Sequence, residues 1–279
     1  MATITETLKA FLDAGDPTAL VEVARAKGST PREAGAYMLV SRKAIHGTIG
    51  GGQLEFMAID QARQMLADAK GPHELMLDIP LGPEIGQCCG GRVEVLVRLV
   101  DDELKAELLR NAEAEDARLP HIYIFGGGHV GQALAGALSL LPVKAAVIET
   151  RAEALEGMPA SVETRLTSVP EEMVRSAPAG AAFVVLTHDH ALDFLIVAEA
   201  LKRKDAAYVG MIGSKTKKAT FRSWYLKSAG GSEADFARLV SPIGGDAVKD
   251  KRPAVIAALA AAEIMTALSH RATRTKSTT

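Results

Sequence analysis

The segment that most constrains the fold is Gly126-Gly127-Gly128-His129-Val130-Gly131, which has the spacing G-x-G-x-x-G. The apolar run 121–125 precedes it, and an Ala- and Leu-rich helical pattern follows to about residue 141. A second apolar run, 143–148, ends in Glu149, 23 residues after the first glycine. A strand, a tight glycine turn, a helix and a second strand ending in an acid form a dinucleotide-type βαβ unit. The sequence therefore predicts an α/β fold whose C-terminal part is a Rossmann-like parallel sheet with helices on both faces.

Each glycine of this fingerprint has an expected task. Gly126 allows the tight turn, Gly128 lets a phosphate approach the backbone, and Gly131 allows the helix to pack closely on the strand. Glu149 is expected to accept hydrogen bonds from ribose hydroxyls. Arg151, two residues further on, could instead face a 2′-phosphate. The pattern therefore does not decide whether the loop binds NAD, binds NADP or binds no nucleotide.

The rest of the chain divides into two expected domains. Strands and helices continue to alternate through 119–279, which predicts parallel strands joined by right-handed crossovers. Residues 1–118 mix short strands with helical patterns and predict an α+β domain, ending where a polar helix ends. Residues 270–279 are polar and basic, so we expect a frayed tail there.

Composition limits the classes of protein that remain. Of the 279 residues 48% are apolar and the formal net charge is −2, which fits a globular, soluble protein and argues against a nucleic-acid-binding one. We see no apolar run near the ~20 residues that span a bilayer, and no secretion signal. Two cysteines exclude a disulfide framework. These features together predict a cytoplasmic protein that binds neither membranes nor nucleic acid, with a homo-oligomer left open.

Both cysteines, Cys88 and Cys89, lie side by side in a glycine-rich loop. Gln87 precedes them, and Gly90-Gly91 and Arg92 follow. A cysteine is most often a small buried apolar residue. Here the adjacency, the glycines and the arginine, whose charge could lower a thiol pKa, favour a chemical role. A thiolate could ligate a soft metal, carry a persulfide or attack an electrophile.

A second glycine-rich loop feeds a helical pattern near residue 54. Gly50, Gly51, Gly52 and Gln53 precede the first apolar residues of that helix. Free N–H groups and the positive end of a helix dipole form an anion site. A plain strand-to-helix turn explains the same local pattern equally well.

Two polar segments follow buried strands near the C-terminal half of the sheet. Thr187-His188-Asp189-His190 could bind a metal or an anion, since ligands of such sheets lie beyond the carboxyl ends of strands. Alternatively, one histidine caps the next helix and the other is solvated. In Gly213-Ser214-Lys215, Ser214 is a candidate N-cap and Lys215 could reach a phosphate. Residues 215–218 could equally be a solvated basic helix face.

Taken together, the motifs are similar to those of the XdhC/CoxI family over nearly the whole chain. The segments that carry the resemblance are Gly47-Thr48-Ile49-Gly50-Gly51-Gly52-Gln53-Leu54-Glu55, Gln87-Cys88-Cys89-Gly90-Gly91-Arg92-Val93-Glu94-Val95, Gly126–Gly131, Thr187–His190, Tyr208-Val209-Gly210-Met211-Ile212-Gly213-Ser214-Lys215 and Ser241-Pro242-Ile243-Gly244. The resemblance implies a chaperone that binds the molybdenum cofactor, in its molybdopterin form, only transiently. Such a chaperone protects the cofactor while a cysteine desulfurase installs its terminal sulfur, and then delivers it to xanthine dehydrogenase.

This implied role adds partners and site residues to the prediction. The partners are xanthine dehydrogenase, the desulfurase and the proteins of molybdenum cofactor biosynthesis. A thiolate suits a molybdenum centre that awaits sulfur, so Cys88 or Cys89 is a candidate metal ligand. No residue is predicted to be catalytic. The candidate cofactor-binding residues are Cys88, Cys89, Gln87, Arg92, Gly50, Gly51, Gly52, Gln53, His188, Asp189 and His190.

Two enzymes remain as alternatives. An NAD(P)-dependent oxidoreductase fits the glycine fingerprint, but Tyr225 and Lys227 do not have Tyr-x-x-x-Lys spacing. A sulfurtransferase that uses a cysteine persulfide fits the thiols, but we find no evident site for its sulfur donor.

Overall fold

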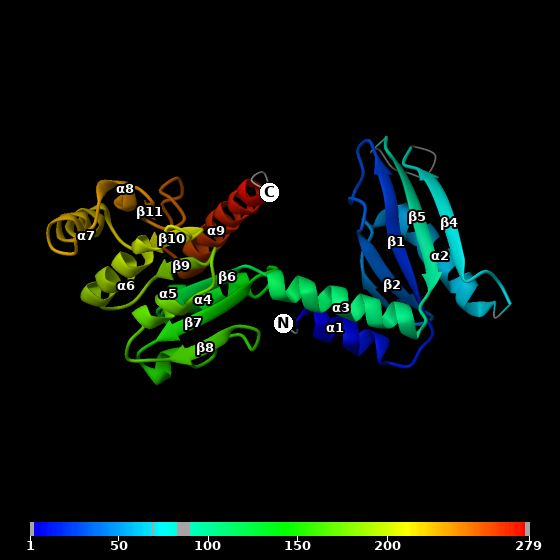
Figure 1. Cartoon of the computed structure of the whole chain (residues 1–279), viewed down its shortest axis with the longest axis horizontal. Coiled ribbons are helices and arrows are strands. Elements are labelled where there is room, and N and C mark those ends of the chain that lie inside the picture. The colour runs from blue at the N-terminus through cyan, green and yellow to red at the C-terminus, as the bar shows by residue number, and fades with distance from the viewer. Residues whose placement is uncertain (1–2, 69, 83–89, 277–279) are drawn as a thin grey trace. The chain divides into compact units, whose positions relative to one another are not determined.

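The structure is a computed structural model that describes residues 3–68, 70–82 and 90–276. The chain divides into two compact units, Ala2–Ala117 and Arg118–Thr279 (Figure 1). Buried apolar side chains form separate clusters in each unit.

The N-terminal unit is built around an antiparallel five-stranded sheet. Its strand order is β3-β2-β1-β5-β4, and every neighbouring pair is antiparallel. The elements in chain order are α1 (Ile4–Leu12), β1 (Thr18–Lys27), β2 (Tyr37–Ser41), β3 (Ile45–Gly47), α2 (Gly52–Ala67), β4 (Glu74–Pro80), β5 (Arg92–Leu99) and α3 (Asp102–Arg118).

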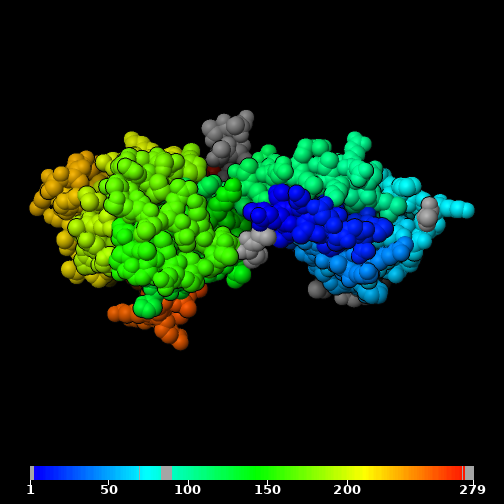
Figure 2. All heavy atoms as spheres, turned by 90° about the horizontal axis from the view of Figure 1, so that it is seen from below, coloured from blue at the N-terminus to red at the C-terminus, as the bar shows by residue number. Residues whose placement is uncertain are grey.

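Helices cover both faces of this sheet. Leu54 and Ala58 of α2 are buried against the inward face of β1 and β5. On the opposite face α1 and α3 lie side by side, as both views show (Figures 1 and 2), and Asp116 of α3 accepts hydrogen bonds from the N–H groups of Ile4 and Thr5. Helix α1 begins with a capping box, in which Thr3 and Glu6 satisfy each other's backbone N–H groups.

The C-terminal unit confirms the predicted Rossmann-like fold. Its six strands are all parallel, in the order β11-β10-β9-β6-β7-β8. The order in which the strands are added to the sheet reverses between β6 and β9, which makes this the topological switch point. Helices α4 and α9 pack on one face of the sheet, and α5, α6 and α7 pack on the other. The elements are β6 (His121–Phe125), α4 (His129–Leu138), β7 (Lys144–Glu149), η2 (Ala152–Leu155), β8 (Glu163–Leu166), α5 (Glu171–Ser176), β9 (Ala182–Val185), α6 (His190–Lys202), β10 (Tyr208–Met211), α7 (Lys215–Lys227), α8 (Glu233–Phe236), β11 (Leu239–Val240) and α9 (Pro253–Lys276).

Helix α9 corrects the expectation of a frayed tail that begins at residue 270. The helix continues to Lys276, since no glycine or proline interrupts it. Arg271 lies beside the turn before β9, where a Cβ built on Gly180 would be 3.0 Å from its Nε.

The same helix also corrects the expectation about apolar runs. Pro253–Arg271 is long and apolar enough to span a bilayer by length and composition alone. One face of α9, however, is buried against α4 and β10 through Ala257, Ala260 and Ile264. Helix α9 thus contributes one buried face to the core of the C-terminal unit.

Candidate functional site

Two loops meet at the carboxyl edge of the Rossmann sheet. The glycine loop (Gly126–Gly131) follows β6, and the histidine loop (Thr187–His190) follows the neighbouring strand β9. A Cβ built on Gly126 would lie 2.6 Å from the carbonyl oxygen of Leu186 and 3.0 Å from the nitrogen of Thr187. Only glycine permits this approach, and its φ of +114° also favours glycine. The strand order reverses at this point, which is where ligands of open α/β sheets bind.

The N-terminus of α4 is accessible within the glycine loop. Gly128 is the N-cap of α4, no side chain caps it, and a Cβ built on it would have no atom within 4 Å among the described residues. An uncapped helix start of this kind attracts anions through its N–H groups and the helix dipole. His129, in the first turn, is exposed beside it. His129 is not among the predicted site residues, although its place inside the glycine fingerprint marks it.

The carboxylate of Glu149 is engaged within the protein. It is 4% exposed, and it accepts hydrogen bonds from the N–H of Gly127 at 2.9 Å and of Thr150 at 2.8 Å. The Thr150 hydroxyl at 3.2 Å and the Arg151 guanidinium at 3.4 Å also donate to it. Burial acts to raise the pKa of Glu149, but these donors outweigh it and hold the pKa below its ordinary value. Both oxygens therefore stabilise the glycine loop and offer little to a ribose.

Helix η2 lies over the same loop. A Cβ built on Gly127 would come within 3.0 Å of the carbonyl oxygen of Ala154, and it would lie 3.3 Å from Cε of Met158. The segment that follows β7 thus packs directly on the glycine loop.

The histidine loop is ordered by its aspartate. Asp189 caps α6 by accepting from the N–H of Ala191 at 2.7 Å, so the cap is neither of the two histidines. His188 and His190 are both exposed. Among the described residues no three His, Cys, Asp or Glu side chains are grouped so that they could hold a metal ion.

The lysines after β10 do not form one solvated face. Ser214 caps α7, as predicted, by accepting from the N–H of Lys217 at 3.2 Å, and Lys215 is exposed. Lys217 and Lys218, in contrast, turn inward. Lys217 pairs with Asp193 of α6, and Lys218 donates to the carbonyl oxygen of Ser241 at 3.2 Å. The basic-face interpretation therefore holds only for Lys215.

In the N-terminal unit, an acid of the protein itself binds the Gly50–Gly52 loop. The Oε2 atom of Glu55 accepts from the Thr48 hydroxyl at 2.6 Å, the Gly51 N–H at 3.0 Å and the Ile49 N–H at 3.2 Å. Burial acts to raise the pKa of Glu55, but these hydrogen bonds prevail and lower it. Part of the predicted anion site is thus filled by Glu55, although no side chain caps α2 at Gly51.

Replacing Glu55 by glutamine is expected to flatten the acid dependence of stability. Because the folded-state pKa of Glu55 is lowered, its stabilisation is present above its unfolded pKa of about 4.3 and is lost as pH falls through the folded pKa. Glu55→Gln should unfold about 1 kcal/mol more easily near pH 7, and the gap should close near pH 3. Thermal unfolding, followed by circular dichroism at pH values from about 3 to 7, measures this stability difference. Glu74→Gln, at an exposed glutamate, is the control. A gap that is constant with pH would contradict the assignment.

One turn touches both glycine-rich segments of the N-terminal unit. A Cβ built on Gly50 would lie 2.5 Å from Cβ of Pro31, and one built on Gly91 would come within 3.0 Å of the carbonyl oxygens of Lys27 and Ser29. Lys27 ends β1, Ser29 and Pro31 lie in the connection from β1 to β2, and Gly50 and Gly91 come just before α2 and β5. The Gly50–Gly52 loop and the Gly90-Gly91 pair are therefore gathered at one end of the N-terminal sheet.

The cysteine loop is only partly described. Gln87, Cys88 and Cys89 lie outside the described residues. Arg92 is described, and it forms a two-pronged pair with Asp78 across β4 and β5, with its Nε at 2.6 Å and its Nη2 at 2.5 Å from the carboxylate. This guanidinium, 58% exposed, is thus engaged by a carboxylate, which weakens its predicted effect on a thiol.

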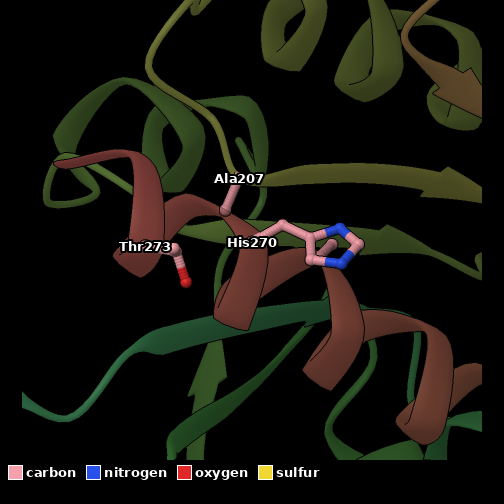
Figure 3. Close-up of a pocket in the computed structure, with 4 residues that line it drawn as sticks. Ala207, His270 and Thr273 are labelled. Carbon is pink, nitrogen blue, oxygen red and sulfur yellow. The ribbon is translucent and has the colours of Figure 1, made fainter. Parts of the chain in front are cut away.

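A surface depression lies at the other edge of the Rossmann sheet. Ala207, Ala267, His270 and Thr273 line it (Figure 3). Ala207 precedes β10, so this depression is at the amino ends of the strands, away from the glycine and histidine loops. Its position does not match the switch point where α/β sheets bind ligands.

Strand order, a glycine loop at the switch point and a parallel six-stranded sheet define the C-terminal unit as a Rossmann domain. Comparison with known families identifies the family to which this Rossmann domain belongs. The sequence pattern of the XdhC Rossmann domain matches residues 122–264, and that of the XdhC and CoxI family matches residues 11–78. The first match alone covers more than half of the chain. The chain therefore belongs to the XdhC and CoxI family.

Two individual proteins are similar to the chain. An uncharacterized protein of Escherichia coli strain K12, YqeB, is 27% identical over 261 residues, which are 89% of this chain. The chain spans only 43% of the length of that relative. A crystal structure described as a xanthine dehydrogenase from Bacillus halodurans is 18% identical, with a TM-score of 0.79 over 97% of both chains. At that identity the likeness establishes the fold alone.

Proposed function

We propose that this protein binds the molybdenum cofactor transiently and delivers it to xanthine dehydrogenase during maturation of that enzyme. The observation that carries the proposal is the uncapped, accessible N-terminus of α4 at the switch point, in a chain of the XdhC and CoxI family. The family supports a role in enzyme maturation, and the helix start supports a phosphate-bearing ligand. The protein acts as a carrier with no reaction of its own, in the cytoplasm.

The residues of the chain divide the proposed task. The N–H groups of the glycine loop would bind the phosphate, with the exposed His188 and His190 beside it. When bound, the cofactor supplies a molybdenum centre that takes up the terminal sulfur. In the N-terminal unit, Cys88 and Cys89, with Gln87 beside them in the sequence, are candidate ligands for such a centre, because thiolates prefer soft metals. The same unit would offer the N–H groups of Gly50–Gly52 and Gln53 at the α2 start, and Arg92 would fix the base of the cysteine loop through Asp78.

A dinucleotide fits the described residues poorly. In a nucleotide-binding Rossmann domain the acid at the end of the second strand accepts from ribose hydroxyls. In this protein Glu149 is buried and accepts four hydrogen bonds from its own chain. The NAD(P)-dependent oxidoreductase alternative therefore loses the ribose-binding role that the sequence predicted for Glu149.

The test of the proposal is the activation of cofactor-free xanthine dehydrogenase. We expect the cofactor-loaded protein, sulfurated by a cysteine desulfurase, to restore activity. Cys88→Ala combined with Cys89→Ala should lower this activation at least about tenfold, since losing even a residue that only supports a metal ligand costs about 10- to 100-fold in affinity or activity. The two single variants identify which thiol matters.

The control is the melting temperature, which should be the same for the double variant and the parent. Activation by the double variant equal to that of the parent would show that the thiols take no part in cofactor handling.

A further inference from the structure

A buried ion pair lies directly beneath the histidine loop. Asp193, in the first turn of α6, is 0% exposed, and the side chain of Lys217, in the first turn of α7, is 9% exposed. Lys217 donates to Oδ2 of Asp193. Oδ1 of Asp193 accepts from the N–H of Thr187 at 3.0 Å and from its hydroxyl at 2.7 Å.

Stability alone is a weak reason for such a pair. Removing two charges from water costs free energy that their attraction barely returns, and apolar replacements of buried pairs are often as stable as the original. Three donors converge on this one carboxylate of α6, however: the ammonium group of Lys217 from α7, and the N–H and hydroxyl of Thr187 from the histidine loop. An arrangement of this kind fixes geometry more than it adds stability.

The backbone is shaped to admit the lysine. A Cβ built on Gly213, just before α7, would lie 2.6 Å from Cδ of Lys217, and Gly213 has a φ of +156°. Glycine at this position therefore leaves the space through which the lysine side chain reaches Asp193.

The network also connects to the glycine loop. Thr187 donates two hydrogen bonds to Asp193. The backbone nitrogen of the same Thr187 would lie 3.0 Å from a Cβ built on Gly126. The Thr187 hydroxyl further accepts from the N–H of Asp189, which caps α6. Hydrogen bonds to Asp193 thus join α7 to the histidine loop, and the histidine loop packs against the glycine loop at Gly126.

We propose that Asp193 and Lys217 are positioning residues. They hold the histidine loop against the glycine loop, so that His188 and His190 serve as recognition groups for an anionic, phosphate-bearing ligand at the α4 N-terminus. This inference rests on the proposed function for the identity of the ligand, but not for the device itself.

The variants separate position from stability. Asp193→Leu combined with Lys217→Met removes both charges and leaves neither partner alone in the core, so the fold is retained. The single variant Lys217→Met leaves Asp193 without its cationic partner and so tests the effect of an unpaired buried acid. Arg222→Met is the matched control, because Arg222 lies on the same helix and pairs with Glu233 at the exposed surface.

The first readout uses the protein without its cofactor. In the double variant, amide hydrogen exchange at Thr187 should be at least about tenfold faster than in the parent, with an unchanged melting temperature. Titration with inorganic phosphate should shift the imidazole resonances of His188 and His190 in the parent and in Arg222→Met, but not in the double variant. Unchanged exchange at Thr187, or imidazole shifts that are equal in parent and double variant or absent from both, would overturn the proposal.

The second readout is the cofactor retained on purification, which should fall at least about fivefold in the double variant. If the parent itself carries no cofactor while the exchange and phosphate results are as expected, the proposed function fails and the positioning role stands.

Discussion

Replacing Gly131 by alanine is expected to prevent the Rossmann domain from reaching its native packing. A Cβ at this position would come within 3.0 Å of the carbonyl oxygen of Gly126, a backbone atom that cannot rotate away. Helix α4 would have to move off β6, and both core clusters of the domain depend on that sheet. We expect a loss of about 3 kcal/mol or more in the free energy of unfolding, measured by chemical denaturation.

The same helix provides the control. A Cβ built on Gly136 meets no described atom within 4 Å, and its place inside α4 favours alanine. Gly136→Ala should therefore be as stable as the parent or more stable by up to about 1 kcal/mol. Equal effects of the two substitutions would show that α4 does not approach β6 as described.

Replacing Gly91 by alanine is expected to displace the base of the cysteine loop. The new Cβ would come within 3.0 Å of the backbone oxygens of Lys27 and Ser29. The carbonyl oxygen of Gly91 also accepts from the N–H of Leu81 at 2.8 Å, where the chain enters the loop. A shift there should cost about 2–3 kcal/mol and raise amide exchange in β4 and β5.

Amide exchange in the Rossmann domain should not change in this variant, because the N-terminal unit has its own core. Gly82→Ala, on the other side of the same loop, is the control, since a Cβ there meets no described atom within 4 Å. An exchange pattern in Gly91→Ala like that of Gly82→Ala would be inconsistent with the described packing.

Local pattern explains why most of the fold could be predicted. The glycine fingerprint, the capping box at Thr3 and the alternation of apolar runs all report on neighbours in sequence. The short helices η2 and α8 were missed because four residues show no periodicity. The end of α9 was missed because its last turns are polar and show no apolar periodicity.

The site was predicted less well, because its key groups act across the fold. Asp193 stands among the apolar residues Leu192, Phe194 and Leu195 of α6, and its partner Lys217 is on the next helix. Glu149 was expected to face a ribose, but the backbone N–H groups that occupy it are visible only in three dimensions. One feature of the sequence could have indicated the role of Glu55. It is an acid in the first turn of a helix, where the free N–H groups of the helix N-terminus attract negative charge.

The central claim is that this protein carries the molybdenum cofactor rather than a dinucleotide. The most direct test is to purify it from cells that make the cofactor and to assay the released pterin, molybdenum and nicotinamide. The account predicts pterin and molybdenum in equal amounts, near one per chain, and no nicotinamide. Nicotinamide at one per chain, with no pterin, would contradict it.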